Sequence, residues 1–553
     1  MKTSNESPPG RREWIGFGCM LVQQAQNAFN DKMAQFLLIP LAAAVGFMIP
    51  LGAGREMDVE SAAGIMIALP FVLFAPLAGW LSDRFSKRDV MLGSALMQLA
   101  VLLMICLAVA NRILGLALVG FFLLAIQSAI FSPAKIGMNK ELLGTRHLGM
   151  AAGVQQMLAI LAILGGQVVA GWWFDERLRS QHGQAVDPWW AASGPLWILT
   201  FSALPALLLA WLIPRVPAQG KAPFNARVAI SHFVHLRDLW QVPALRSCAL
   251  GIAFFWGMAA WINLWSVKLA RELTGGGEGF GTVSSIFMAA ASVGMAIGFG
   301  IAAIFLRRRI ELGWVPVSGM AMTVAAVILG FSDPGKALHY LQIVDSGFIP
   351  VGHWPMIELL FLCALAAMAF FSALFLAPIN AWIQDRYPAD KRGEMQAAVN
   401  LQDCLAGILA VILVAVIEFS GSVMGLDPMT GFQLQMMLIA AACLLATILM
   451  IRAFPAEMIR MLATRLIRVF YHVRAVGSQR IPESGGVLLL PNHVTYADAF
   501  YLSAASPRPI RFVMDDVFAA NAAIQWFTRL FDTVNIKREQ PMEAIREVIS
   551  ALR

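Results

Sequence analysis

The sequence GWLSDRFSKR, from Gly79 to Arg88, separates two long apolar segments. Gly79 permits close packing between helices. Asp83, with the basic residues that follow it, can form a charge network at the edge of a membrane that breaks when the helices move. The network members we expect are Asp83, Arg84, Lys87 and Arg88. A solvated basic loop is the simpler alternative, because positive residues are common in cytoplasmic loops.

The chain as a whole has the composition of a membrane protein. Of the 553 residues, 59% are hydrophobic and 14% charged, and the mean hydropathy is +0.69. Runs of about 20 apolar residues, enough to cross roughly 30 Å of hydrocarbon, recur and predict about twelve helices. We expect spans at 14–48, 61–81, 89–110, 112–132, 148–172, 191–213, 244–268, 280–306, 312–331, 355–384, 394–420 and 432–453. The first and the tenth are too long for one straight crossing, which predicts a break or an extension past the lipid.

The positions of Lys and Arg predict the orientation, because these residues are retained on the cytoplasmic side. The basic clusters at Arg11–Arg12, Arg84–Arg88, Lys140–Arg146, Arg307–Arg309 and Arg386–Arg392 fall on one side if the N-terminus lies inside. Both termini are then cytoplasmic. The net charge of +7 reflects this topology and contact with anionic lipid headgroups, and no nucleic-acid partner is expected. No signal-peptide cleavage site follows Arg12, so we expect the first span to be retained.

The twelve spans divide into two halves, 13–213 and 244–453, joined by a cytoplasmic linker at 214–243. Two related stretches support a duplication: one begins SPAKIGMNKELLG at Ser132, the other APINAWIQDRYPA at Ala377. Pro133 to Gln156 spans 23 positions and Pro378 to Gln402 spans 24. Duplicated halves of this kind place a substrate cavity at their interface.

Polar residues inside the spans are the candidates for substrate binding, because such groups are costly in lipid. Asn27, Asn30 and Asp31 share one helical face and predict a polar stripe facing a cavity, although Lys32 could instead neutralise Asp31 for helix packing. Lys135 can supply a cation to a phosphate, or it can extend to the lipid–water interface.

The second half contributes a similar set. Asn400, Gln402 and Asp403 lie close together in the eleventh span, and polar contacts between helices are the alternative. Trp256 and Asn263, in the aromatic stretch FFWGMAAWINLW, suit an amphiphilic substrate, with aromatic packing as the commoner explanation. The six cysteines lack metal or disulfide spacing and are expected to act as small hydrophobic residues.

The stretch at Gly79 matches the pattern G-x-x-x-D-R-x-x-[KR]-[KR] of the major facilitator superfamily, while its counterpart GIAAIFLRRR at Gly300 lacks the aspartate. Four blocks resemble the bacterial lysophospholipid transporter family of that superfamily: AFNDKMAQ at 28–35, FSPAKIGMNKEL at 131–142, FFWGMAAW at 254–261 and APINAWIQDR at 377–386. The resemblance implies inward flipping of lysophospholipids, such as lysophosphatidylethanolamine, across the bacterial inner membrane. Lys32 stands where that family usually has asparagine.

The segment after Pro455 has a different composition. Residues 454–475 space arginines among apolar residues and predict an amphipathic helix at the lipid surface. Residues 476–553 predict a soluble α/β segment, in which GGVLLLP at 485–491 is typical of a buried strand and ADAFYLSAA at 497–505 of a helix.

His493 and Asp498 form an H-x-x-x-x-D motif between that strand and that helix. A carboxylate that orients an imidazole can make it a general base for attack of a hydroxyl on an acyl thioester. The local alternative is a capping box between Thr495 and Asp498.

The context VLLLPNHVTYADAF resembles the first block of the glycerophospholipid acyltransferase family. The resemblance implies a 1-acyl- or 2-acyl-glycerophospholipid O-acyltransferase that takes its acyl group from acyl carrier protein or coenzyme A, with no bound cofactor or metal. Arg538 is a candidate phosphate contact. The family's later FPEGT-like block has no counterpart, so we expect only the first part of the domain here, either a piece of a longer fusion or an inactive remnant.

Three functions remain open at this point. The first is a lysophospholipid flippase fused to an acyltransferase that reacylates the product. The second is a general exporter of drugs or other amphiphiles, coupled to protons through Asp31 or Asp403. The third makes the tail the functional part and the bundle its membrane anchor.

Overall fold

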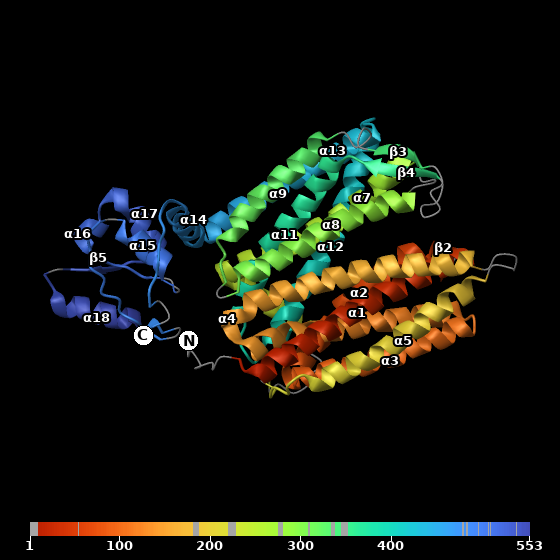
Figure 1. Cartoon of the computed structure of the whole chain (residues 1–553), viewed down its shortest axis with the longest axis horizontal. Coiled ribbons are helices and arrows are strands. Elements are labelled where there is room, and N and C mark those ends of the chain that lie inside the picture. Colours follow the sequence, from red (N-terminus) through yellow and green to blue (C-terminus); the bar gives the residue numbers. More distant parts are fainter. Residues whose placement is uncertain are drawn as a thin grey trace. The chain divides into compact units, whose positions relative to one another are not determined.

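The computed structural model describes residues 9–52, 55–180, 187–218, 220, 228–274, 280–307, 310–332, 338–343, 352–477, 480–482, 485–495, 497–506, 508, 510–537 and 539–552. The chain forms two compact units. The larger consists of Pro9–Ile310 and Ser318–Thr447, and the other of Met1–Pro8, Glu311–Val317 and Ile448–Arg553. Figure 1 shows the course of the chain through their elements.

Long helices make up the membrane bundle. They are α1 (Arg11–Ala44), α2 (Val59–Arg84), α3 (Lys87–Ala110), α4 (Leu114–Arg179), α5 (Pro188–Leu212), α7 (Pro243–Thr274), α8 (Phe280–Phe305), α9 (Trp314–Phe331), α11 (Leu359–Arg386), α12 (Arg392–Val423) and α13 (Pro428–Ala453). Within the described residues, ten helices are long and apolar enough to span a membrane. Helix α1 is not among these ten, and a stripe of polar side chains along its buried face lowers its hydropathy. A shorter helix, α6 (Val228–Gln241), lies within the predicted linker.

Helix α4 contains the predicted fourth and fifth spans in one 66-residue run. The two parts meet at Gly144, whose φ of 65° breaks the regular helix. Only glycine adopts this left-handed region without steric cost. Counted as two crossings, α4 agrees with the prediction of about twelve spans.

The two overlong spans end where short strands begin. Strand β1 (Met48–Gly52) follows α1 and pairs antiparallel with β2 (Arg55–Asp58). Strand β4 (Gly352–Ile357) precedes α11 and pairs antiparallel with β3 (Leu338–Ile343). Each of these two long helices is therefore flanked by a short antiparallel pair of strands, and the predicted extension past the lipid stays a prediction.

The bundle is organised as two helix groups. Helix α1 packs against α4 and α5, and α3 packs against the same two helices, around buried residues such as Leu37, Leu102 and Ile105. In the second group α8 packs against α11 and α7 against α12. Contacts of α2 with α12 and of α4 with α8 and α11 join the groups.

The other unit holds the C-terminal segment, with α14 (Pro455–Phe470), α15 (Asp498–Ala505), β5 (Val513–Asp515), α16 (Asp516–Ala519), α17 (Ala522–Phe531), β6 (Val534–Ile536) and α18 (Pro541–Leu552). Strands β5 and β6 pair in parallel. Four aromatic rings form the centre of the segment: Phe500, Phe512, Phe527 and Phe531.

The predicted helix at 497–505 is confirmed by α15, but the buried strand predicted at 485–491 is wrong. That run is not part of a sheet, and Leu490 is 85% exposed. The two strands of this unit, β5 and β6, pair with each other, so the apolar run has no strand partner among the described residues.

Candidate functional site

A buried polar network surrounds Asp31 inside the first helix group. Asn27 of α1 donates hydrogen bonds to Asp31 Oδ2 at 3.1 Å and to Ser128 Oγ at 3.1 Å, and its own Oδ1 accepts from Gln127 Nε2 at 2.9 Å. The Ser128 hydroxyl also donates to Asp31 Oδ2. Residues of α4 therefore hold the side chains of the predicted stripe on α1.

The network extends to two further helices. Gln127 Nε2 donates to Ser94 Oγ of α3 at 2.6 Å, and Ser202 of α5 donates to Asn30 Oδ1 at 3.1 Å. The sequence analysis missed these four partners. Gln127 and Ser128 were visible as an isolated polar pair within an apolar span, whereas Ser94 and Ser202 carried no distinctive signal.

Two polar atoms of the network have no hydrogen bond among the described residues. They are Asn30 Nδ2 and Asp31 Oδ1, both buried. Lys135 of α4 interacts electrostatically with Asp31, and its Nζ lies 5.6 Å from the centroid of the Phe131 ring. Lys32 donates a 3.0 Å bond to Gln35 Oε1. The site thus combines a carboxylate oxygen that has no hydrogen bond among the described residues with the positive charge of Lys135, which acts on the same carboxylate.

The three polar residues predicted in α12 point to different surroundings. Gln402 donates to the Ala249 carbonyl at 2.7 Å and accepts from Trp240 Nε1 at 2.9 Å, so its amide is paired at both ends. Asn400 donates to Ser132 Oγ of α4 at 3.4 Å, a contact between the two groups. Asp403 Oδ1 is buried and accepts no hydrogen bond within the described part of the chain.

The side chains of the aromatic stretch in α7 also lie in different surroundings. Trp256 is 41% exposed and meets Phe255 edge-on, with 5.3 Å between ring centroids. Asn263 Nδ2 lies 3.5 Å from the sulfur of Met288 on α8. Trp265 is buried and donates to the Phe432 carbonyl at 3.2 Å. None of these contacts links the three side chains to the Asp31 network within the part of the chain that the structure describes.

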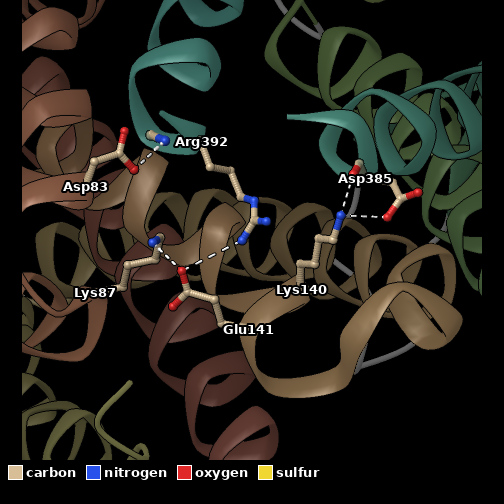
Figure 2. A network of polar contacts seen from close by, with 7 residues as sticks. Asp83, Lys87, Lys140, Glu141, Asp385 and Arg392 are labelled. Carbon is tan, nitrogen blue, oxygen red and sulfur yellow. Dashed lines mark hydrogen bonds and ion pairs between the residues drawn. The ribbon is translucent and has the colours of Figure 1, made fainter. Parts of the chain in front are cut away.

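A second cluster lies where α2 meets the start of α12, and we call it the α2–α12 junction (Figure 2). Asp83 accepts the backbone N–H groups of Gly393 at 2.8 Å and Glu394 at 3.0 Å. A carboxylate is stabilised at a helix N-terminus by the free N–H groups and the helix dipole. Gly79 makes this approach feasible, since a Cβ there would lie 2.8 Å from Glu394 Cα.

Ion pairs continue from the junction into α4 and α11. Lys87 pairs with Glu141, both buried, and Arg392 Nη1 lies 3.8 Å from the same carboxylate. Lys140 Nζ lies 2.7 Å from Asp385 Oδ1. This ion pair is drawn in Figure 2. Of the predicted gating residues, Asp83 and Lys87 thus lie in a network that reaches the second group.

Within the described residues, the contacts of Arg84 and Arg88, the other two basic residues of the segment 79–88, do not join this network. Arg88 binds Asp89 at 3.1 Å and the Trp211 carbonyl at 2.9 Å, within the first group. Arg84 is exposed. The residues that the sequence analysis missed here are Lys140, Glu141, Asp385, Arg392 and Gly393, all in or directly after the two related stretches.

The tail carries a separate site. His493 Nδ1 lies 2.9 Å from Asp498 Oδ2, and that oxygen also accepts the backbone N–H groups of Val494 at 2.7 Å and Thr495 at 2.9 Å. These bonds, first that from Thr495, lower the pKa of Asp498. A carboxylate on Nδ1 leaves Nε2 free to accept a proton, and the imidazole is 74% exposed. Arg538 lies outside the described residues.

Comparison with known proteins separates the membrane bundle from the C-terminal segment. The family model described as Major Facilitator Superfamily matches residues 32–411, and the Acyltransferase model matches residues 472–553. Lysophospholipid transporter LplT of Photorhabdus laumondii is 26% identical over 372 residues, covering 67% of this chain and 80% of the relative. The LplT protein of Pectobacterium carotovorum is 27% identical over 318 residues, covering 57% and 67%.

Solved structures show the fold alone. The Escherichia coli fucose:proton symporter FucP superposes with a TM-score of 0.59 at 14% identity, over 80% of this chain and 99% of that one. The human organic anion transporter MFSD10 gives 0.54 at 15% identity, over 80% and 100%.

Proposed function

Because this chain belongs to the major facilitator superfamily and carries an acyltransferase domain at residues 472–553, we propose that it moves lysophospholipids inward across the bacterial inner membrane for reacylation. The relationship to lysophospholipid transporters is distant, at 26% identity. Lysophosphatidylethanolamine is the substrate that we would test first, and membrane lipids surround the bundle.

The observation that carries the proposal is the Asp31 oxygen without a hydrogen bond among the described residues, together with the charge of Lys135 that acts on the same carboxylate. A buried polar atom without a partner is costly unless a ligand or water satisfies it. A zwitterionic headgroup offers an ammonium group to Asp31 and a phosphate to Lys135. Asn27 and Asn30 add neutral hydrogen-bonding groups. The roles of Trp256, Asn263, Asn400, Gln402 and Asp403 in substrate binding stay predictions.

The α2–α12 junction supplies the gate in this proposal. With both termini in the cytoplasm, the junction lies on the cytoplasmic side. Its contacts join the two halves there, so the headgroup site opens to that side only after Asp83 leaves the start of α12. Alternating access by movement of one half against the other is typical of duplicated transporters.

Together with the later part of the acyltransferase domain, the tail then acylates the delivered lipid. His493 Nε2 takes the proton from the free glycerol hydroxyl as its oxygen attacks the thioester carbonyl of acyl carrier protein or coenzyme A. The C–S bond breaks, and the proton passes from the imidazolium to the leaving thiolate. Asp498 holds the imidazole in the required tautomer. Fusion raises the local concentration of the lysophospholipid at the acyltransferase.

Uptake of labelled lysophosphatidylethanolamine by spheroplasts tests the transport step. We expect Asp31→Asn to lose uptake and His493→Ala to keep it. Asp427→Asn is the control, because Asp427 is exposed and bonds to Thr430 within its own turn. Wild-type uptake no higher than that of vector cells, with the protein correctly inserted, would sink the assignment.

A general proton-coupled exporter is the second candidate, and the buried unpaired oxygen of Asp403 favours it. Efflux of an amphiphilic dye that collapses with the proton gradient, and that Asp403→Asn abolishes, would support it. A third candidate treats the bundle as an anchor, in which case Asp31→Asn changes no transport.

A further inference from the structure

Helix α14 turns the side that carries most of its polar residues, together with Met461, toward the rest of the C-terminal unit. Met461 and Thr464 are buried on that side. Arg468 donates a 2.7 Å hydrogen bond to the Ala504 carbonyl of α15. At the end of the helix, the ring of Tyr471 meets that of Tyr501 edge-on, with 5.4 Å between centroids. Helix α14 is therefore attached to α15, the helix that begins with Asp498.

The opposite side of α14 is apolar and exposed. Leu462 is 41% exposed, Leu466 56%, Val469 76% and Phe470 75%. Residues three and four positions apart share a helix face, so these four side chains form one apolar stripe. A helix on a water-soluble unit buries its apolar stripe and exposes its polar face. Helix α14 shows the reverse arrangement, which requires an apolar medium or partner on its outer side.

The path of the chain identifies that medium. Helix α13, a membrane-span candidate, ends at Ala453, and α14 begins at Pro455. In the last turns of α13, Ile448 and Leu449 are 39% and 47% exposed. An apolar surface that faces lipid on α13 is thus followed, one residue past its end, by the apolar stripe of α14.

The charges of α14 fit the same location. Arg465 is 48% exposed and lies 3.8 Å from Glu311, with its guanidinium 5.5 Å from the centroid of the Trp314 ring. Arg452, in the last turn of α13, is also exposed. Basic residues beside an apolar stripe are attracted to anionic headgroups.

We propose that α14 lies in the headgroup layer of the membrane, with Leu462, Leu466, Val469 and Phe470 inserted among the acyl chains. Through Arg468 and Tyr471 it then holds α15, and with it the His493–Asp498 pair, at the lipid surface. A lipid hydroxyl would reach His493 there without leaving the membrane. The membrane contact is independent of the substrate proposed above, and only its use in acyl transfer rests on that proposal.

Fluorescence quenching in the full chain, reconstituted into vesicles containing anionic phospholipid, tests the contact. A bimane probe is attached to Leu466→Cys after the six native cysteines have been replaced, and Leu462→Cys provides a second position. Ile412→Cys is the lipid control, since Ile412 is 52% exposed on span α12. Val517→Cys is the water control, since Val517 is 80% exposed on α16.

We expect lipids with a nitroxide on the acyl chain to quench the probe at Leu466 as strongly as that at Ile412. Aqueous iodide should quench it several-fold less than the probe at Val517. Iodide quenching equal to that at Val517 would overturn the proposal. Protection from both quenchers would overturn it as well, because a second copy or another protein segment would then cover the stripe. Lipid quenching in a chain that fails to take up lysophosphatidylethanolamine would leave this inference standing and remove the proposed substrate.

Discussion

Lys140 and Asp385 form an ion pair between the two halves of the bundle, with 2.7 Å between Nζ and Oδ1, and they occupy equivalent positions of the two related stretches. Each lies seven residues after the proline that aligns the stretches, Pro133 in one and Pro378 in the other. Equivalent positions near a pseudo-two-fold axis meet each other when the halves close. Two identical charges at these positions would repel each other. Because one stretch has lysine and the other has aspartate, the contact between the closed halves is attractive.

Reversing one charge of this pair should favour separation of the two halves at the α2–α12 junction. Lys140→Asp and Asp385→Lys each place like charges together, and the double substitution restores opposite charges. The side chains are 15% and 20% exposed, so we expect each single change to cost about 1 kcal/mol, roughly fivefold in the closed-to-open ratio. Distances between spin labels on α4 and α11 measure that ratio. A double variant no more closed than the singles would contradict the pairing.

Filling the space at Gly79 should separate α2 from α12. A Cβ at this position would lie 2.8 Å from Glu394 Cα and 2.9 Å from the Gly393 carbonyl oxygen. We expect Gly79→Val to destabilise the closed state by about 1–3 kcal/mol, as overpacking does, and to reduce uptake. Gly93→Val on α3 is the control, because nothing lies within 4 Å of a Cβ there. Equal effects of the two substitutions would show that α2 and α12 do not need this contact.

The spans were predictable because each depends on a local apolar run, whereas the short strands that follow α1 and precede α11 were not predicted. The continuous α4 was not predictable, since the polar connection around Gly144 looks the same in a loop and in a bent helix. The strand predicted at 485–491 from its apolar composition is wrong, because that run has no strand partner among the described residues.

The sites divide in the same way. The stripe of Asn27, Asn30 and Asp31 follows from helical spacing within one segment. The partner of Asp83 could not be predicted, because Gly393 is 310 residues away and contributes only a backbone N–H. Asn400 and Gln402 were predicted to belong to one site because they are close in sequence. Successive residues of a helix are turned by 100°, so the two side chains contact different neighbours.

Removing the Gln402 amide should affect stability more than substrate binding. Gln402→Leu leaves the buried Ala249 carbonyl without this donor, at a cost of about 1–3 kcal/mol. It also removes the acceptor of the indole N–H of Trp240, which is 43% exposed. Asn400→Leu, at a contact between the halves, is the comparison. We expect a lower thermal unfolding midpoint for Gln402→Leu in detergent and an unchanged KM for uptake. A raised KM with an unchanged midpoint would instead assign Gln402 to the substrate.

The turn that holds His493 should persist to acidic pH. Hydrogen bonds from the Thr495 and Val494 backbones, together with His493, hold the pKa of Asp498 below its usual range. A lowered folded-state pKa stabilises the turn above the unfolded value of about 3.9, and this contribution is lost only as the pH falls through the folded value. Carboxyl ¹³C NMR of labelled aspartate, with Asp498→Asn to assign the signal, should give a midpoint below about 3.9. A midpoint above that value would mean that the carboxylate does not accept these bonds, and the orientation of His493 would need another cause.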